Sequence, residues 1–213
     1  MRAFLAVIFS AVLVGVNSLQ CEQCAGIGST CSGTAHTCAP DVRRCIRGLE
    51  NNALAKGDTI LFSYKGCHEA LKRKYCSKDL SFRNSVFAMR IGTSCCTTDK
   101  CNSDSLAVTA PIDLVPNGLK CPDCFTDKSS QGCVATQEIT CTGNHNMCGS
   151  FNGTAARAGE SAKPHSFRGC ISKDACDVGL PSFAGSHASS YDLKCTPALR
   201  PQTRPALLNT LSQ

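Results

Sequence analysis

The feature that most constrains the fold of this chain is a repeated pattern of cysteine residues. The chain has 213 residues and 18 cysteines, which form two sets with matching spacings. Cys45 and Cys67 are separated by the same interval as Cys148 and Cys170, and each set opens with a Cys-x-x-Cys pair. A repeat of this kind indicates two copies of one structural unit. The sets are Cys21, Cys24, Cys31, Cys38, Cys45, Cys67, Cys76, Cys95, Cys96 and Cys101, then Cys121, Cys124, Cys133, Cys141, Cys148, Cys170, Cys176 and Cys195.

The N-terminal residues 1–18 have the composition of a secretory signal peptide. Arg2 supplies a positive charge, residues 3–16 form an apolar run, and cleavage is expected after Ser18. We therefore expect a secreted, extracellular protein whose cysteines are oxidised. The last residues, 197–213, are polar and rich in proline, and they lack the hydrophobic tail of a glycolipid-anchored precursor. No membrane anchor is expected.

The stretch between the two cysteine sets is interpreted as a short, semi-stiff linker. It contains no cysteine and is punctuated by Pro111, Pro116 and Gly118. The expected organisation is a signal peptide over 1–18, a first domain over 19–102, a linker over 103–118, a second domain over 119–196 and a polar tail over 197–213.

The pattern within each repeat favours short strands. Residues 59–65 are rich in strand-forming types and follow a turn signal at Gly57, so residues 45–67 are predicted to form a hairpin. Residues 85–91 alternate as a half-buried strand does, and no window has a sustained helical period. The predicted class is all-β and disulfide-rich.

The cysteine frame resembles the three-finger superfamily of snake toxins and urokinase-receptor-type domains. The resemblance is carried by Leu19-Gln20-Cys21-x-x-Cys24 at the start and by Cys95-Cys96-Thr97-Thr98-Asp99-Lys100-Cys101-Asn102 at the end. It implies two tandem three-finger domains and a disulfide pairing that the cysteine count alone leaves open. The implied bridges are Cys21–Cys45, Cys24–Cys31, Cys38–Cys67, Cys76–Cys95 and Cys96–Cys101, then Cys121–Cys148, Cys124–Cys133, Cys141–Cys170 and Cys176–Cys195.

The second repeat departs from the family pattern at its end. Cys195 is followed by Thr-Pro-Ala-Leu, so the last small ring is absent and Asn102 has no counterpart. The end of the second domain is therefore expected to be looser than the end of the first.

Two groups of two-domain proteins show this truncated end, and the resemblance extends to both. One comprises the gamma-type phospholipase A2 inhibitors of reptile serum. The other comprises the sodefrin-precursor-like factors, which are courtship proteins of salamanders and newts. The second group is favoured on the segments Cys21-Glu-Gln-Cys24, Cys31-Ser-Gly-Thr34, Gly48-Leu-Glu-Asn-Asn52, Cys121-Pro-Asp-Cys-Phe125 and Cys170-Ile-Ser-Lys-Asp-Ala-Cys176.

The favoured resemblance implies a secreted, non-enzymatic pheromone that acts on a chemosensory receptor, and the alternative is an inhibitor of secreted phospholipase A2. The tail offers Arg200-Pro201 and Arg204-Pro205, and proline after arginine makes a poor cleavage site for trypsin-like proteases. The intact protein is therefore expected to be the active form. A structural or antimicrobial secretion is a third class, suggested only by the net charge of +6.

The sequence carries no recognisable catalytic or cofactor motif. It has no Gly-x-Ser-x-Gly elbow, no phosphate-binding glycine loop and no pair of histidines at metal-ligand spacing. We therefore expect no enzymatic activity, no catalytic or metal-binding residue and no cofactor. Lysine and arginine are scattered rather than gathered in a stripe, which argues against nucleic-acid binding. The expected partner is a protein receptor or a secreted protein target, and the oligomeric state is left open.

Binding is expected at the tips of the fingers, where rigid hairpins present residues at little ordering cost. The chain also has one glycosylation sequon, Asn152-Gly153-Thr154, and a glycan there would exclude one face of the second central finger from contact. The candidate binding residues are Glu50, Asn51, Asn52 and Lys56 in the first domain and Phe183 and Tyr191 in the second.

Overall fold

The computed structural model describes six stretches of the chain, residues 18–54, 57–68, 74–104, 110–156, 160–181 and 185–200. The predicted signal peptide up to residue 17, Lys56, Phe183 and the tail from residue 201 lie outside these stretches. The elements are β1 (Gln20–Ile27), β2 (Thr34–Thr37), β3 (Cys45–Leu54), β4 (Thr59–Cys67), β5 (Asp79–Arg83), β6 (Phe87–Cys96), β7 (Pro116–Thr126), β8 (Gln137–Thr142), β9 (Met147–Ala156), β10 (Lys163–Ile171), α1 (Lys173–Val178) and β11 (His187–Pro197).

The first repeat forms an antiparallel array in the order β2-β1-β4-β3-β6-β5. The predicted hairpin over residues 45–67 is confirmed, with β3 and β4 in register from Cys45 opposite Cys67 to Ala53 opposite Thr59. The strand predicted from residue 85 begins two residues later. The reason is that the Asn84 side chain accepts hydrogen bonds from the N–H groups of residues 86 and 87, both at 2.8 Å, and so closes a turn there.

The second repeat has the order β11-β9-β10-β7-β8, and its third finger differs from that of the first. A short helix, α1, contains Cys176, whereas the equivalent Cys76 of the first repeat lies in a turn just before strand β5. Ser172 caps the helix by accepting a hydrogen bond from the N–H of Ala175, and Gly179 ends it with a φ of 74°. The sequence analysis missed this helix because six residues are too few to display a helical period.

Nine disulfides hold the base of the fingers, and they are the pairs that the resemblance implied. The all-β, disulfide-rich class is thereby confirmed, and the cysteines at the base are buried together in two small clusters, one per repeat. The bridges are Cys21–Cys45, Cys24–Cys31, Cys38–Cys67, Cys76–Cys95, Cys96–Cys101, Cys121–Cys148, Cys124–Cys133, Cys141–Cys170 and Cys176–Cys195.

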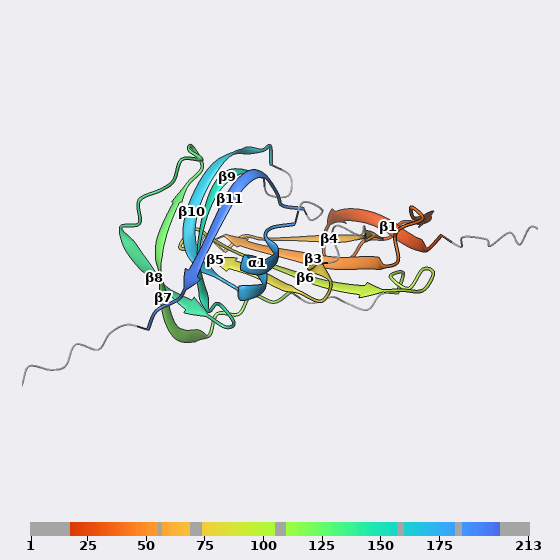
Figure 1. Cartoon of the computed structure of the whole chain (residues 1–213), viewed down its shortest axis with the longest axis horizontal. Helices are drawn as coiled ribbons and strands as arrows, with labels where there is room; N and C mark the ends of the chain where they lie inside the picture. The colour runs from red at the N-terminus through yellow and green to blue at the C-terminus, as the bar shows by residue number, and fades with distance from the viewer. Residues whose placement is uncertain are drawn as a thin grey trace, which may run out of the picture.

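The two repeats are joined into one continuous sheet of eleven strands. Strand β10 of the second repeat pairs with β5 of the first, with Cys170 opposite Arg83 and Ile171 opposite Phe82. In Figure 1 these two strands lie side by side where the repeats meet, with α1 in front of them. The outer edge of the first repeat is thus closed by the second rather than left as an unpaired strand.

The main apolar core lies between the repeats, not inside either of them. Phe82 stands 4.7 Å from Phe167, measured between ring centroids, and Phe167 stacks on Phe151 at 4.5 Å. Aromatic side chains supply large buried areas. Outside the two disulfide clusters, most of the stabilisation from apolar burial therefore comes from this junction. The buried members are Tyr75, Leu80, Phe82, Met89, Ile91, Phe151, Phe167, Ile171, Ala175 and Val178.

Candidate binding surfaces

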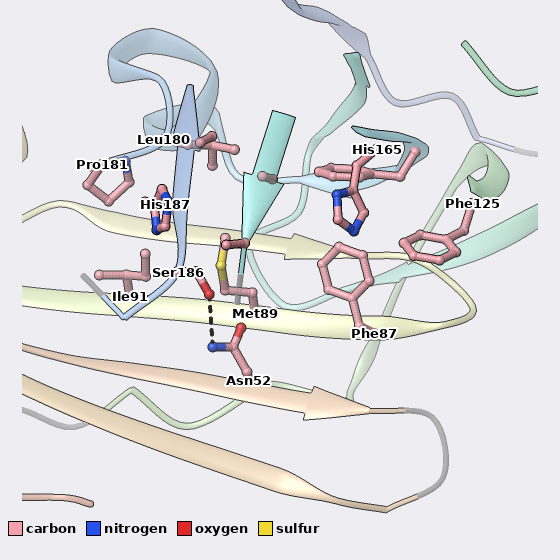
Figure 2. Close-up of a pocket in the computed structure, with 14 residues that line it drawn as sticks. Asn52, Phe87, Met89, Ile91, Phe125, His165, Leu180, Pro181, Ser186 and His187 are labelled. Atoms are coloured by element: carbon pink, nitrogen blue, oxygen red, sulfur yellow. Dashed lines mark hydrogen bonds between the residues drawn. The ribbon is translucent and has the colours of Figure 1, made fainter. Parts of the chain in front are cut away.

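The polar residues predicted at the tip of the first central finger lie instead at the junction of the repeats. Strand β3 continues to Leu54, so Glu50 and Asn52 belong to the strand. Glu50 is fully buried, and its carboxylate accepts hydrogen bonds from the N–H of Ser186 at 2.9 and 3.0 Å. Asn52 donates a hydrogen bond to Glu50. It also donates to the hydroxyl of Ser186 at 3.3 Å, as Figure 2 shows. The prediction that Glu50 and Asn52 form an exposed binding tip is therefore wrong.

Asn51 faces the opposite side of strand β3 and is also engaged within the molecule. Its side-chain amide donates to the carbonyl oxygen of Ala110 at 3.1 Å, and Ala110 is itself buried. The segment expected to act as a short, semi-stiff linker is thus attached to the first repeat at this point. Asn51 supports the arrangement of the chain and is only half-exposed.

Tyr191 is turned inward, although the sequence placed it on a binding loop. Its ring lies 5.4 Å from Phe151, and its hydroxyl accepts a hydrogen bond from the N–H of Leu180 at 3.0 Å. A register shift between Ser189 and Asp192 marks a bulge that carries it, with Ser190 at a φ of 47°. Tyr191 therefore fixes the third finger of the second repeat against the core.

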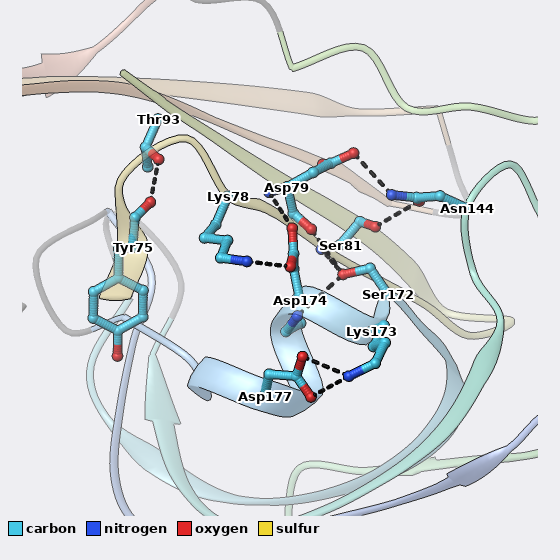
Figure 3. A network of polar contacts seen from close by, with 11 residues as sticks. Tyr75, Lys78, Asp79, Ser81, Thr93, Asn144, Ser172, Lys173, Asp174 and Asp177 are labelled. Carbon is cyan, nitrogen blue, oxygen red and sulfur yellow. Dashed lines mark hydrogen bonds and ion pairs between the residues drawn. The ribbon is translucent and has the colours of Figure 1, made fainter. Parts of the chain in front are cut away.

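A polar network locks β5 to the start of α1 (Figure 3). The Ser172 hydroxyl donates to the carbonyl oxygen of Asp79 at 2.8 Å and accepts from the N–H of Ser81 at 3.1 Å. Lys78 forms an ion pair with Asp174 at 2.7 Å, and the carboxylate of Asp174 also accepts from the N–H of Asp79 at 3.2 Å. The hydrogen bond from Lys78 lowers the pKa of Asp174 below its ordinary value. These contacts fix the angle between the repeats.

The ends of the two repeats are held in different ways. In the first, Asn102 is fully buried and bonds to the backbone of Glu22 through both its oxygen and its nitrogen, at 2.9 and 3.0 Å, and to the carbonyl oxygen of Ile46 at 3.1 Å. In the second, where Asn102 has no counterpart, a short backbone bridge joins Leu199 to Lys120. The second end thus has backbone pairing in place of a ring and a buried amide.

The sequon residue Asn152 lies in the middle of β9 and is half-exposed. Its neighbour Phe151 points into the core and is fully buried. Side chains alternate along a strand, so Asn152 faces the side of the sheet away from the junction. A glycan at this position, which remains a prediction, would leave the junction untouched.

The exposed large hydrophobic residues of the described stretches are all aliphatic. The aromatic rings of the second repeat that the structure describes are directed into the junction or stacked against it. Single exposed aliphatic residues are normal on a soluble surface and need no special explanation. The exposed residues are Ile27, Val86, Leu114, Val115, Val134 and Leu199.

Three groups of cysteine and histidine side chains converge closely enough to suggest metal ligation, among them Cys121, Cys141 and Cys170. Every cysteine in these groups belongs to a disulfide. A disulfide sulfur has no thiolate charge with which to bind a metal. These groups therefore carry no metal site. Among the described residues, no helix has the length and apolar composition needed to cross a bilayer.

Comparisons with known proteins agree with this architecture. A family model described as the u-PAR/Ly-6 domain matches residues 17–104 and 117–196. A gamma-type phospholipase A2 inhibitor chain of Elaphe climacophora is 29% identical over 199 residues, covering 92% of this chain and 95% of the relative. The 25 kDa phospholipase A2 inhibitor chain of Naja kaouthia is 28% identical over 185 residues, covering 86% and 96%. The crystal structure of mouse TEX101 is a distant match, with a TM-score of 0.36 and 12% identity over 84% of this chain and 98% of that one.

Proposed function

The chain belongs to the u-PAR/Ly-6 domain family, and we propose that it is a secreted, non-enzymatic binding protein that acts intact, as a signal read by a chemosensory receptor. On this proposal its partner is a protein, and the fingers form the surface that the partner contacts. The resemblance of its cysteine-flanking segments to sodefrin-precursor-like factors supports the signalling role.

The observation that carries the proposal is that the large aromatic side chains at the junction pack inside the molecule. Phe82, Phe151 and Phe167 are buried at the junction of the repeats, and the exposed large hydrophobic residues of the described stretches are aliphatic. Binding hot spots that seal an apolar target are rich in tryptophan, tyrosine and arginine. A surface with few exposed aromatic rings favours polar, adaptable recognition over a tight hydrophobic seal.

The rigidity of the junction also supports a binding role. The nine disulfides stiffen each repeat internally. The pairing of β5 with β10, the shared apolar core and the Glu50 contact then hold the two repeats together as one body. A partner that binds several fingers at once then loses little free energy to ordering them, because their positions are already fixed.

A second candidate function is inhibition of a secreted phospholipase A2. It is favoured because the two snake relatives, which this chain matches over most of their length, are named as phospholipase A2 inhibitors. In that role this chain would contact its target through aliphatic residues such as Val134 and Ile27 and through polar finger tips.

One paired experiment separates the two candidates. The purified, oxidised protein is added at micromolar concentration to a phospholipase hydrolysis assay, and is applied to the olfactory epithelium of receptive animals with electrical recording. Reduced and alkylated protein is the matched control, because it keeps the composition and loses the fold. We expect a response of the epithelium with no inhibition. Stoichiometric inhibition at nanomolar concentration with a silent epithelium would establish the inhibitor, and silence in both assays would reject both roles.

A further inference from the structure

A pocket with an almost entirely apolar lining opens at the junction, beside the contact between Glu50 and Ser186 (Figure 2). Its volume is about 60 Å³. One wall is formed by Phe87 and Met89 of β6, and the other by residues of the second repeat, including Phe167. Well-packed protein interiors leave few spaces larger than a water molecule, so an open space of this size needs a physical reason.

The reason lies in the small side chains on the second wall. Ala155 and Ala156 of β9 and Ala188 of β11 line the pocket opposite the large side chains of β6. Alanine ends at its Cβ atom and cannot reach across the junction. Water in such a space finds few hydrogen-bonding partners, so replacing it with an apolar group is favourable.

Two polar side chains of the lining that are buried or half-buried, those of His165 and Ser186, offer groups to a ligand, and the exposed His187 also lines the pocket. The Nδ1 atom of His165 lies 2.9 Å from the carbonyl oxygen of Lys163, which can only accept, so Nδ1 carries a hydrogen and Nε2 can accept from a ligand in the tautomer that this contact selects. The hydroxyl of Ser186 accepts from Asn52 and keeps its own hydrogen for donation. A ligand thus meets one acceptor and one donor within an apolar lining.

We propose that this pocket binds a small, uncharged molecule with an apolar body and a single hydroxyl or carbonyl group. A volume of 60 Å³ is several times the roughly 10–15 Å³ that a single water molecule needs, which suits a short alkyl chain. No aspartate, glutamate, lysine or arginine lines the pocket, so a charged ligand would lose its hydration without gaining a permanent counter-charge. This binding is separate from recognition of a protein partner by the fingers.

The first test uses the secreted chain labelled at its methionine methyl groups and titrated with hexan-1-ol. Beyond Met1, the chain has two methionines. Met89 lines the pocket, whereas Met147 packs against the core elsewhere and is the internal control. We expect a saturable shift of the Met89 methyl signal and little change at Met147. Equal shifts of the Met89 and Met147 methyl signals, or no saturable shift, would overturn the proposal. Because no partner protein is present, the result is independent of the proposed receptor role.

The second test fills the pocket. Ala188→Leu places a longer side chain at a half-buried position of the lining, and Ala35→Leu makes the same change at an exposed position of β2. We expect Ala188→Leu to weaken hexan-1-ol binding at least tenfold while the thermal midpoint stays near that of the parent, and Ala35→Leu to leave binding unchanged. Hexanoate should bind the parent at least tenfold more weakly than hexan-1-ol. Undiminished alcohol binding by a folded Ala188→Leu protein, or tighter binding of hexanoate, would reject this site.

Discussion

Replacing Phe82 with alanine should destabilise both repeats at once, because the ring lies between them. Phe82 is 2% exposed, and its centroid lies 4.7 Å from that of Phe167 in the second repeat and 5.4 Å from that of Phe87 in the first. Its truncation therefore removes contacts on both sides of the junction and leaves a space that neither repeat can fill alone.

The expected loss in the free energy of unfolding is about 4 kcal/mol. Truncating a buried phenylalanine to alanine costs roughly 3–5 kcal/mol, with the larger values where the surroundings cannot collapse. Here the backbone pairing of Phe82 with Ile171 and the bonds of Ser81 to Ser172 hold the walls apart. With a urea dependence of about 2 kcal/mol per molar, the midpoint should fall by about 2 M.

The assay is equilibrium unfolding in urea with the disulfides intact, read by hydrogen exchange and mass spectrometry of peptides from each repeat. We expect a single transition in which peptides of both repeats lose protection at the same lowered urea concentration. Ile27→Ala is the control, because Ile27 is 74% exposed and its truncation should change the free energy by no more than about 0.5 kcal/mol. A second-repeat midpoint that stays unchanged in Phe82→Ala would refute the shared core.

Three further outcomes are expected. Asn102→Ala should lower the unfolding free energy by about 3 kcal/mol, since it leaves backbone groups of β1 and β3 unpaired, and denaturant titration measures this. Burial lowers the pKa of His145 to about 4, so the folded state favours the neutral ring. The contribution of His145 to the unfolding free energy should therefore be full above about pH 6.5 and fall by roughly 3 kcal/mol toward pH 4. His145→Gln should reduce this dependence of stability on pH. Amides near Leu199 should exchange faster than those near Cys101, because backbone hydrogen bonds hold the second end where a disulfide ring closes the first, and equal protection would contradict this reasoning.

The cysteine frame was informative because its constraints are local and repeated. The matching cysteine intervals predict two copies of one unit, and the strand-forming residues that follow the turn signal at Gly57 predict the hairpin over residues 45–67 that the register of β3 and β4 confirms. The helix α1 escaped prediction because its signals are brief. In retrospect Ser172 followed by Asp174 is the start of a helix, with a capping hydroxyl and an acidic residue in the first turn, but six residues give no periodicity to support it.

The junction could not be predicted because its partners are distant in sequence. Glu50, Asn51 and Asn52 are typical loop residues, and a turn signal at Gly57 follows them, so an exposed tip was the natural interpretation. The main-chain N–H that Glu50 binds belongs to Ser186, which lies 136 residues away in the sequence, and no local pattern predicts this contact. Likewise, nothing in the strand containing Phe82 indicates that a strand of the other repeat will cover it.

The contact at Glu50 has a consequence for how this protein can change over generations. The second repeat contributes to it the N–H of its main chain at position 186, which any amino acid except proline possesses. Substitution at position 186 therefore need not release the loop, whereas loss of the carboxylate at position 50 would. The side chain at position 186 can therefore vary while the finger stays where it is. A lineage could thus change the surface chemistry at this position without rebuilding the contact that holds the finger.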